Sequence, residues 1–159
     1  MHGVNAISEG PALTDADAMS HALELARAAG EAGEVPVGAV VVVGGRIVGA
    51  AGNRREATGD PTAHAEILAL REAAALLGSW RLAGASLLVT VEPCPMCAGA
   101  VVLARLERIV FGARDGRAGC AGSVYRIPED PAFNHFARCD GGLLAEECGA
   151  LLQKFFRII

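Results

Sequence analysis

Four side chains that can build a hydrolytic metal site occur in two short segments of the chain. His64 and Glu66 stand in His-Ala-Glu, and Cys94 and Cys97 follow in Pro-Cys-Pro-Met-Cys. Zinc prefers imidazole and thiolate ligands, and a catalytic zinc site takes three protein ligands and leaves the fourth position to water. Because no further Cys or His follows at ligand spacing, the sequence predicts one zinc ion per chain, held by His64, Cys94 and Cys97, with an open position.

Glu66 is expected to remain outside the ligand set, two residues beyond His64. A free carboxylate there can take a proton from a zinc-bound water, pass it to a ring nitrogen of the substrate and then protonate a departing amine. Zinc lowers the pKa of its water to about 7, so a nucleophile exists at neutral pH. These parts predict hydrolytic removal of an amino group from an aromatic ring, with Glu66 as proton shuttle.

Each half of the motif is less specific than the two together. A Cys-x-x-Cys pair alone is also typical of half a zinc ribbon or of a redox pair. A zinc site can also belong to a non-catalytic module that binds RNA or protein. Glu66 is the discriminating residue, since a scaffold site does not need it. The other cysteines, Cys120, Cys139 and Cys148, are expected to be small apolar groups of the core.

The elements that must position this motif are predicted from periodicity and capping signals. A capping box at 14–17 precedes apolar residues at helical spacing that continue to about residue 30. The apolar stretches 35–43 and 46–51 are joined by Gly44-Gly45, which is a hairpin signal. A polar loop is expected over 53–62. Further helices are predicted over 63–77, 95–105 and 143–157, and further strands over 86–91, 108–112 and 137–139.

This order of elements indicates an α/β layered domain, with helices on both faces of one sheet. Two strand–helix–strand connections predict that part of the sheet is parallel. Both halves of the zinc motif fall at helix N-termini, which carry about half a positive charge and unpaired N–H groups. That environment favours the thiolate, which is the form of cysteine that binds metal.

Length and composition fit one globular domain over residues 14–159, preceded by a flexible leader over 1–13. The longest apolar stretch has nine residues, far fewer than the roughly 20 that a membrane helix needs. The first residues lack the basic start and apolar stretch of a signal peptide. The odd number of cysteines, five, argues against a disulfide framework, so a cytoplasmic protein is expected.

The net charge of −4 is not typical of a protein that binds nucleic acid. The charge is unevenly distributed, however: residues 1–34 have a balance of −5, whereas residues 101–127 have a balance of +3. Thirteen of the fourteen basic residues are arginine, the type suited to phosphate contacts and base stacking. The charge pattern is thus compatible with an RNA partner without requiring one.

The combined motif resembles that of the zinc-dependent nucleobase deaminases. Several longer segments are similar to the tRNA-specific adenosine deaminases of bacteria within that superfamily. They are 34–40 (Glu-Val-Pro-Val-Gly-Ala-Val), 60–66, 92–100, 110–115, 119–123, Asn134-His135, 144–148 and Phe155-Phe156. The zinc motif is shared with cytidine and guanine deaminases, whereas the segments after Val110 favour the tRNA enzymes.

This resemblance implies a cytidine-deaminase-like three-layer α/β/α fold with a five-stranded mixed sheet, and a homodimer. It implies deamination of adenosine to inosine at the wobble position of tRNA, with an arginine tRNA as the expected substrate. Asn53 would then hydrogen-bond the target adenine, Asp115 and Asn134 would line the pocket for the anticodon loop, and the Cys94 backbone N–H would help to hold the developing oxyanion. A deaminase of free guanine or cytidine remains the alternative. Phe155 and Phe156 are expected to pack in the core.

Overall fold

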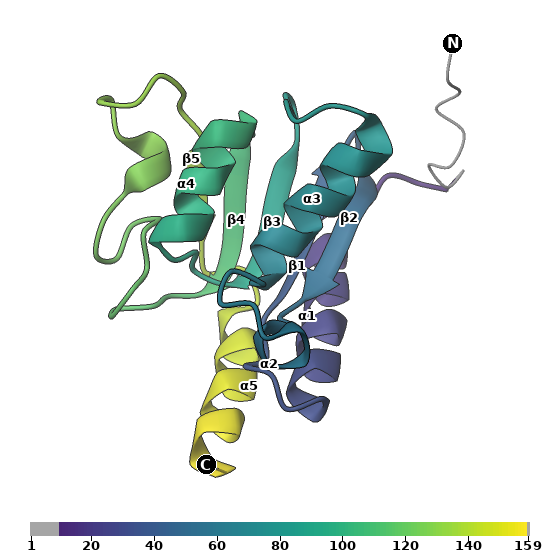
Figure 1. Cartoon of the computed structure of the whole chain (residues 1–159), viewed down its shortest axis with the longest axis vertical. Helices are drawn as coiled ribbons and strands as arrows, with labels where there is room; N and C mark the ends of the chain where they lie inside the picture. The colour runs from purple at the N-terminus through teal and green to yellow at the C-terminus, as the bar shows by residue number, and fades with distance from the viewer. Residues whose placement is uncertain (1–9, 159) are drawn as a thin grey trace.

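The computed structural model of the protein describes residues 10–158 (Figure 1). Most of the predicted leader, residues 1–9, lies outside the described residues. In its described part, the Pro11 carbonyl accepts a hydrogen bond from Arg46 at 2.7 Å, and the Leu13 N–H donates to the Gly45 carbonyl at 2.9 Å. Over the described range, no helix combines the length and the apolar character needed to span a membrane.

Helices and strands alternate along most of the described chain. In order they are α1 (Asp15–Glu31), β1 (Gly38–Val43), β2 (Arg46–Gly52), α2 (Arg55–Thr58), α3 (Ala65–Leu77), β3 (Ser86–Val91), α4 (Pro95–Ala104), β4 (Arg108–Ala113), the short 3₁₀ helix η1 (Ile127–Glu129), β5 (Arg138–Gly141) and α5 (Ala145–Ile158). The capping box predicted before α1 is present, because Thr14 and Asp17 each accept the other's backbone N–H.

As predicted, the five strands form one mixed sheet, and their order is β2-β1-β3-β4-β5. β1 runs antiparallel to both β2 and β3, whereas β3, β4 and β5 are parallel. The β1–β2 hairpin turns at Gly44 and Gly45, whose φ angles are +56° and +75°. Two successive positive φ angles are the geometry that glycine adopts without strain and that matches the twist of a two-residue hairpin.

Helices cover both faces of the sheet, so the fold is the predicted three-layer α/β/α sandwich. Figure 1 shows α3 and α4 in front of the sheet and α1 behind it. Val41, Leu87 and Ile109 pack in one core with buried residues of α3 and α4. The neighbouring strand positions Val40, Leu88 and Val110 pack in a second core with α1 and α5. This alternation follows from the two-residue period of a strand.

Glycines allow a helix to approach the sheet closely on each face. A Cβ on Gly38 would lie 1.9 Å from the Ala22 carbonyl oxygen of α1, and a Cβ on Gly49 would lie 2.2 Å from the Ala69 carbonyl oxygen of α3. Neither backbone carbonyl can move away without disturbing its helix. These glycines thus determine how closely the helices approach the sheet. One of these helices is α3, which follows His64.

Several boundaries differ from the sequence-based prediction, and one short helix was not predicted. β1 begins at Gly38 and not at Val35, since Pro36 cannot donate to a strand ladder. The polar loop contains α2, which buries none of its side chains and therefore has no apolar periodicity to reveal it. β5, predicted over 137–139, lies at Arg138–Gly141. α5 begins at Ala145, because the preceding Leu144 has a positive φ of 52°.

Candidate metal centre and its cavity

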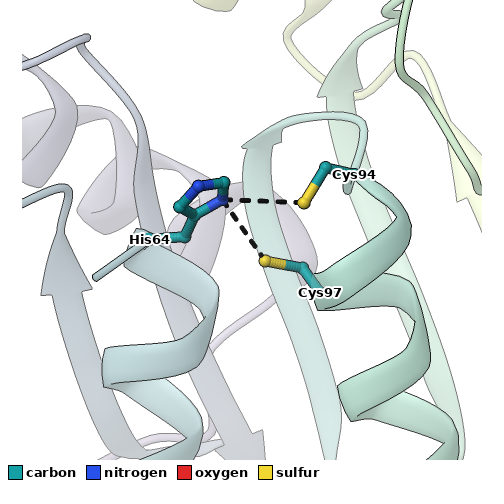
Figure 2. Close-up of side chains that lie close together, drawn as sticks. All are labelled: His64, Cys94 and Cys97. Carbon is teal, nitrogen blue, oxygen red and sulfur yellow. Dashed lines mark hydrogen bonds between the residues drawn. The ribbon is translucent and has the colours of Figure 1, made fainter. Parts of the chain in front are cut away.

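The structure brings the imidazole of His64 and the thiols of Cys94 and Cys97 together (Figure 2). His64 Nδ1 lies 3.6 Å from the Sγ atoms of both Cys94 and Cys97. A tetrahedral zinc ion with bonds of about 2.3 Å to sulfur and about 2.0–2.1 Å to nitrogen holds such atoms about 3.6 Å apart. The three donors therefore fit zinc in both type and spacing.

Two helix N-termini position these ligands. His64 is the N-cap of α3 and Cys94 is the N-cap of α4, and both have extended backbone conformations. Pro95 occupies the first turn of α4, where its missing N–H costs nothing. Cys97 lies in the same turn and is fully buried. Figure 2 shows the side chains entering the site from the starts of the two neighbouring helices.

The environment stabilises a thiolate at Cys94. Hydrogen bonding from the Cys97 thiol is the largest cause that lowers the pKa of Cys94, to about 5. The Cys97 and Met96 backbone N–H groups and the nearby His64 lower this pKa further, while burial opposes them. Because the two sulfurs share one proton, the pKa of Cys97 is raised. The first thiolate is thus available at neutral pH, and metal binding must displace the proton of the second.

Among the described residues, no fourth protein ligand completes the cluster. Within residues 10–158, the only such group of His, Cys, Asp or Glu ligand atoms comprises His64, Cys94 and Cys97, whose ligand atoms lie within 4.8 Å of one another. Cys120 is buried nearby, but its Sγ faces the Ala118 carbonyl at 3.5 Å. A metal ion held by these three ligands would have a fourth coordination position that none of the described residues fills.

Glu66 lies in the first turn of α3 and is buried, with a relative exposure of 3%. It lines the same cavity as His64 and Cys94 without belonging to the ligand cluster. Burial is the main cause that raises the pKa of Glu66 above its usual value, and the negative charge of Cys94 adds to it. A carboxyl group with a raised pKa can exchange a proton near neutral pH more readily than an exposed glutamate.

The cavity beside the metal centre has a volume of about 510 Å³, within the range of small-molecule sites. Polar and charged residues at its wall include Asn53, Arg55, His64, Glu66, Glu92, Cys94, Arg114, Asp115 and Arg117, and apolar ones include Val35, Val37, Val91, Leu152 and Phe156. The cavity therefore joins the metal centre to two of the predicted substrate-binding residues, Asn53 and Asp115. Asn134 is exposed and is not among its lining residues.

Asn53 connects three segments around the cavity. Its side-chain oxygen accepts the Ala65 N–H at 2.8 Å, and its amide nitrogen donates to the Val35 carbonyl at 3.2 Å. Because Ala65 is the first residue of α3, the Asn53 oxygen satisfies one of the free N–H groups at that helix end. Asn53 is thus more than the turn residue that its position after Gly52 suggests. Its predicted contact with the adenine stays a prediction.

Phe156 does not pack in the core, which corrects the expectation for the Phe155-Phe156 pair. Its side chain is 55% exposed and lines the cavity. The two rings meet edge to face, with centroids 5.4 Å apart.

The expectation for the remaining cysteines holds for Cys120 and Cys148, which are buried, whereas Cys139 is half-buried.

Sequence reasoning missed two buried carboxylates, Glu92 at the cavity wall and Glu34 next to the lining residue Val35. Glu34 accepts the backbone N–H groups of Glu56 and Ala57 in α2. Burial opposes the charge of Glu92, but hydrogen bonds from Ser123, Asp115 and Ala121 together lower its pKa below the usual value. A glutamate directly after a buried strand is a signal that could have identified Glu92.

Comparison with known proteins agrees with this geometry. Residues 13–113 match the cytidine and deoxycytidylate deaminase zinc-binding region. A tRNA-specific adenosine deaminase of Bacillus subtilis is 52% identical over 139 residues, which cover 87% of this chain and 86% of the relative. A structure from a study of A-to-I editing by tRNA:A34 deaminases at the wobble position of transfer RNA has a TM-score of 0.82 and 44% identity, covering 85% of this chain and 98% of that one.

A solved guanine deaminase from Nitrosomonas europaea also shares the fold. Its TM-score is 0.80 at 27% sequence identity, covering 95% of this chain and 88% of that one. The layered fold is therefore shared with enzymes that are named for different bases.

Proposed function

The chain belongs to the cytidine and deoxycytidylate deaminase family of zinc-dependent hydrolases, and we propose that it deaminates adenosine to inosine at the wobble position of tRNA. The observation that carries this proposal is one cavity lined by two of the three zinc ligands and a buried, non-ligating Glu66. The similarity to tRNA-specific adenosine deaminases supports the choice of base and of RNA. The family resemblance makes an arginine tRNA the expected substrate.

The residues of the chain have distinct roles in this mechanism. His64, Cys94 and Cys97 would hold a zinc ion, which would lower the pKa of a water molecule in the site to about 7. The Glu66 carboxylate takes one proton from the attacking water and delivers it to a ring nitrogen of adenine. It then takes the remaining proton of the new hydroxyl group on C6 and transfers it to the amino group, which leaves as ammonia while the C6 carbonyl forms. The N–H group of Cys94 faces the developing oxyanion. Burial of Glu66 keeps this proton transfer away from bulk water.

An unpaired loop is the form of RNA that this cavity can accept. The amino group on C6 of adenine lies on the pairing edge and is inaccessible in a duplex, whereas a loop base can be turned out of its stack at low cost. Asn53 and Asp115 line the cavity in which such a base would lie. Arg55, Arg114 and Arg117 surround the same cavity and supply positive charge for the phosphates. Asn134, outside it, would contact a more distant part of the anticodon loop.

The proposal includes a homodimer. Between α3 and α4 lies an apolar groove of about 280 Å³, lined by Ile67, Leu70, Arg71, Ala74, Trp80, Leu82, Ala100, Leu103 and Ala104. Trp80 and Leu103 are 61% and 70% exposed. Large apolar side chains gathered on one face are typical of a surface that a partner covers. A second copy of this chain is the occupant that the family resemblance favours. The enzyme is expected to act in the cytoplasm, where tRNA is modified.

Deamination of a free base is the second candidate, because the guanine deaminase from Nitrosomonas europaea shares the fold. The same zinc centre and Glu66 would serve either reaction. The two functions differ in the substrate that must fill the cavity. A base with no attached RNA makes no use of the three arginines around it.

The deciding experiment incubates the zinc-loaded protein with total tRNA and reads A-to-G changes at the anticodons by sequencing. Turnover of free guanine, cytidine and adenosine is measured in parallel. Inosine at a wobble position supports the proposal, and its restriction to an arginine tRNA supports the finer substrate assignment. Turnover of free bases without any change in tRNA would refute the tRNA proposal. A protein that binds zinc and RNA but has neither activity would be a non-catalytic module.

A further inference from the structure

Two buried carboxylates lie outside the metal centre. Glu92 lines its cavity, and Glu34 directly precedes Val35, which lines it too. Glu34 and Glu92 are only 3% and 2% exposed. Neither forms an ion pair with a basic side chain among the described residues. Both accept their hydrogen bonds mainly from backbone N–H groups of other segments. A buried carboxylate is costly unless such bonds satisfy it, so each one must be held in a defined place.

Glu92 holds the loop that follows β4. It accepts the Asp115 N–H at 3.2 Å, the Ala121 N–H at 3.1 Å and the Ser123 N–H at 2.9 Å, and also the Ser123 hydroxyl. The backbone of Gly119 lies against the same carboxylate, because a Cβ there would come within 2.4 Å of Glu92. One side chain therefore collects four donors from residues 115–123.

Glu34 holds α2 in place through two backbone N–H groups. Its two carboxylate oxygens accept the Glu56 N–H at 3.0 Å and the Ala57 N–H at 2.9 Å. These N–H groups belong to the first turn of α2, and Arg54, the N-cap of that helix, provides no side-chain cap. Glu34 thus supplies the cap from a distant part of the chain.

The segments held in this way have little apolar anchoring of their own. α2 has no buried residue. Arg114, Gly116, Arg117 and Ala118 are exposed, and Asp115 is only partly buried. Farther along the same loop Ala121 packs in the core, so the hydrogen bonds matter most for α2 and for the exposed residues 114–118. Charge-assisted bonds to a buried carboxylate are about twice as strong as neutral ones.

Both segments bring arginines to the cavity. Arg55 stands in α2, and Arg114 and Arg117 stand in the loop after β4. The Arg114 guanidinium also lies 5.4 Å from the centroid of the Phe111 ring. The carboxylates therefore determine where the positive charge around the catalytic cavity is placed.

We propose that Glu34 and Glu92 are positioning residues for the substrate, which set the arginine-bearing walls, α2 and residues 114–117, against the backbone of the RNA loop. This inference rests on the proposed function, because it takes an RNA loop as the substrate. The two carboxylates act through Arg55 and Arg117 and not through the metal.

Steady-state inosine formation on an anticodon stem-loop tests the proposal with Glu34→Gln and Glu92→Gln. A glutamine keeps the shape but turns one acceptor into a donor that faces an N–H group. KM is expected to rise about tenfold and kcat to stay within about threefold, since substrate binding is lost and not chemistry. Zinc content and the visible spectrum of the cobalt-substituted protein should not change. Glu24→Gln, an exposed carboxylate on α1, is the matched control.

Double-mutant cycles separate positioning from general stabilisation. Glu34→Gln should have little further effect in an Arg55→Ala background, and Glu92→Gln should have less effect in an Arg117→Ala background. If the fold-changes in KM of the two single variants multiply in the double variant, the residues act independently and the proposal is overturned. An altered cobalt spectrum, or a fall in kcat at constant KM, would also overturn it. If Glu92→Gln does not fold, Ser123→Ala, which removes one donor only, decides whether KM rises.

Binding of the stem-loop, followed by fluorescence anisotropy, makes the same comparison without turnover. If the wild-type protein forms no inosine, the proposed function is refuted. The dissociation constants of wild type and variants for the stem-loop then test this inference alone. A wild-type protein that forms inosine, with variants of unchanged KM and unchanged dissociation constant, would overturn this inference alone.

Discussion

The side-chain oxygen of Asn53 accepts the backbone N–H of Ala65 at 2.8 Å. This bond ties the residue after β2 to the start of α3, the helix whose first turn carries Glu66 and whose N-cap is His64. The other end of the same side chain is bonded to the Val35 carbonyl. The candidate metal ligand His64, the proposed proton shuttle Glu66 and the cavity wall are thus connected through one amide.

Asn53→Ala should lower both stability and activity. The Ala65 N–H and the Val35 carbonyl lose their partners in a nearly buried place, which costs about 1–3 kcal/mol. Urea denaturation measures the loss, and inosine formation measures activity. Asn134→Ala is the control for stability, since that exposed side chain should change it by less than about 0.5 kcal/mol. Equal stabilities of the two variants would contradict a structural role for Asn53.

Glu66→Gln should abolish activity while keeping zinc and fold. Burial penalises the charge of Glu66 and raises its pKa, so an uncharged glutamine of the same shape can occupy this place. Without a group that can exchange a proton, the rate should fall about 10³- to 10⁴-fold. Single-turnover inosine formation, zinc analysis and thermal unfolding test this expectation. Glu72→Gln, exposed on the same helix, serves as control, and an active Glu66→Gln enzyme would disprove the proton-shuttle mechanism.

The affinity for zinc should decrease as the pH is lowered, and the decrease should be steeper below about pH 5. The pKa of Cys94 is about 5 and that of Cys97 is raised. At neutral pH, zinc therefore displaces the proton of Cys97, whereas below about pH 5 it must also displace that of Cys94. Competition with a chromogenic chelator at several pH values measures the slope of affinity against pH. A constant affinity between pH 5 and 7 would show that no thiol proton is displaced.

Asp15→Asn should destabilise the protein at neutral pH by up to about 1 kcal/mol, because Asp15 forms a half-exposed ion pair. Arg108 donates to both of its oxygens at 2.6 and 2.7 Å, which lowers the pKa of Asp15. A lowered carboxyl pKa stabilises the fold above the unfolded value of about 3.9, and this contribution disappears as the pH falls through the folded value. Wild type and variant should therefore converge in stability toward pH 2. A difference that persists there would have another cause.

Leu103→Glu should disrupt the proposed homodimer. Leu103 is 70% exposed beside the groove between α3 and α4, and a charge there would be costly to bury against a second copy. Light scattering after gel filtration is expected to show a dimer for the wild type and a monomer for the variant. Ala28→Glu, at an exposed position of α1 in the opposite layer, should remain dimeric. A wild-type monomer would refute the dimer itself.

Sequence reasoning predicted the ligand cluster and the layered sheet because both follow from local signals. Periodicity located α3 and α4, and the capping positions placed His64 and Cys94 at their N-termini. β2 and β3 run in the same direction, since both are antiparallel to β1, so the helices that follow them begin at the same edge of the sheet. Ligand type and spacing then specify the metal without any tertiary information.

The tertiary structure alone decided how the cavity is built. Which N–H groups Glu34, Glu92 and Asn53 accept depends on segments up to 31 residues away in the chain. α2 buries no side chain, and Asn134 lies outside the cavity although Asp115 lines it. No periodic pattern encodes these relationships, because a hydrogen bond to a distant backbone depends on where the whole chain places that backbone and not on residue type. The sequence thus determined the chemistry, and packing determined the shape in which that chemistry is held.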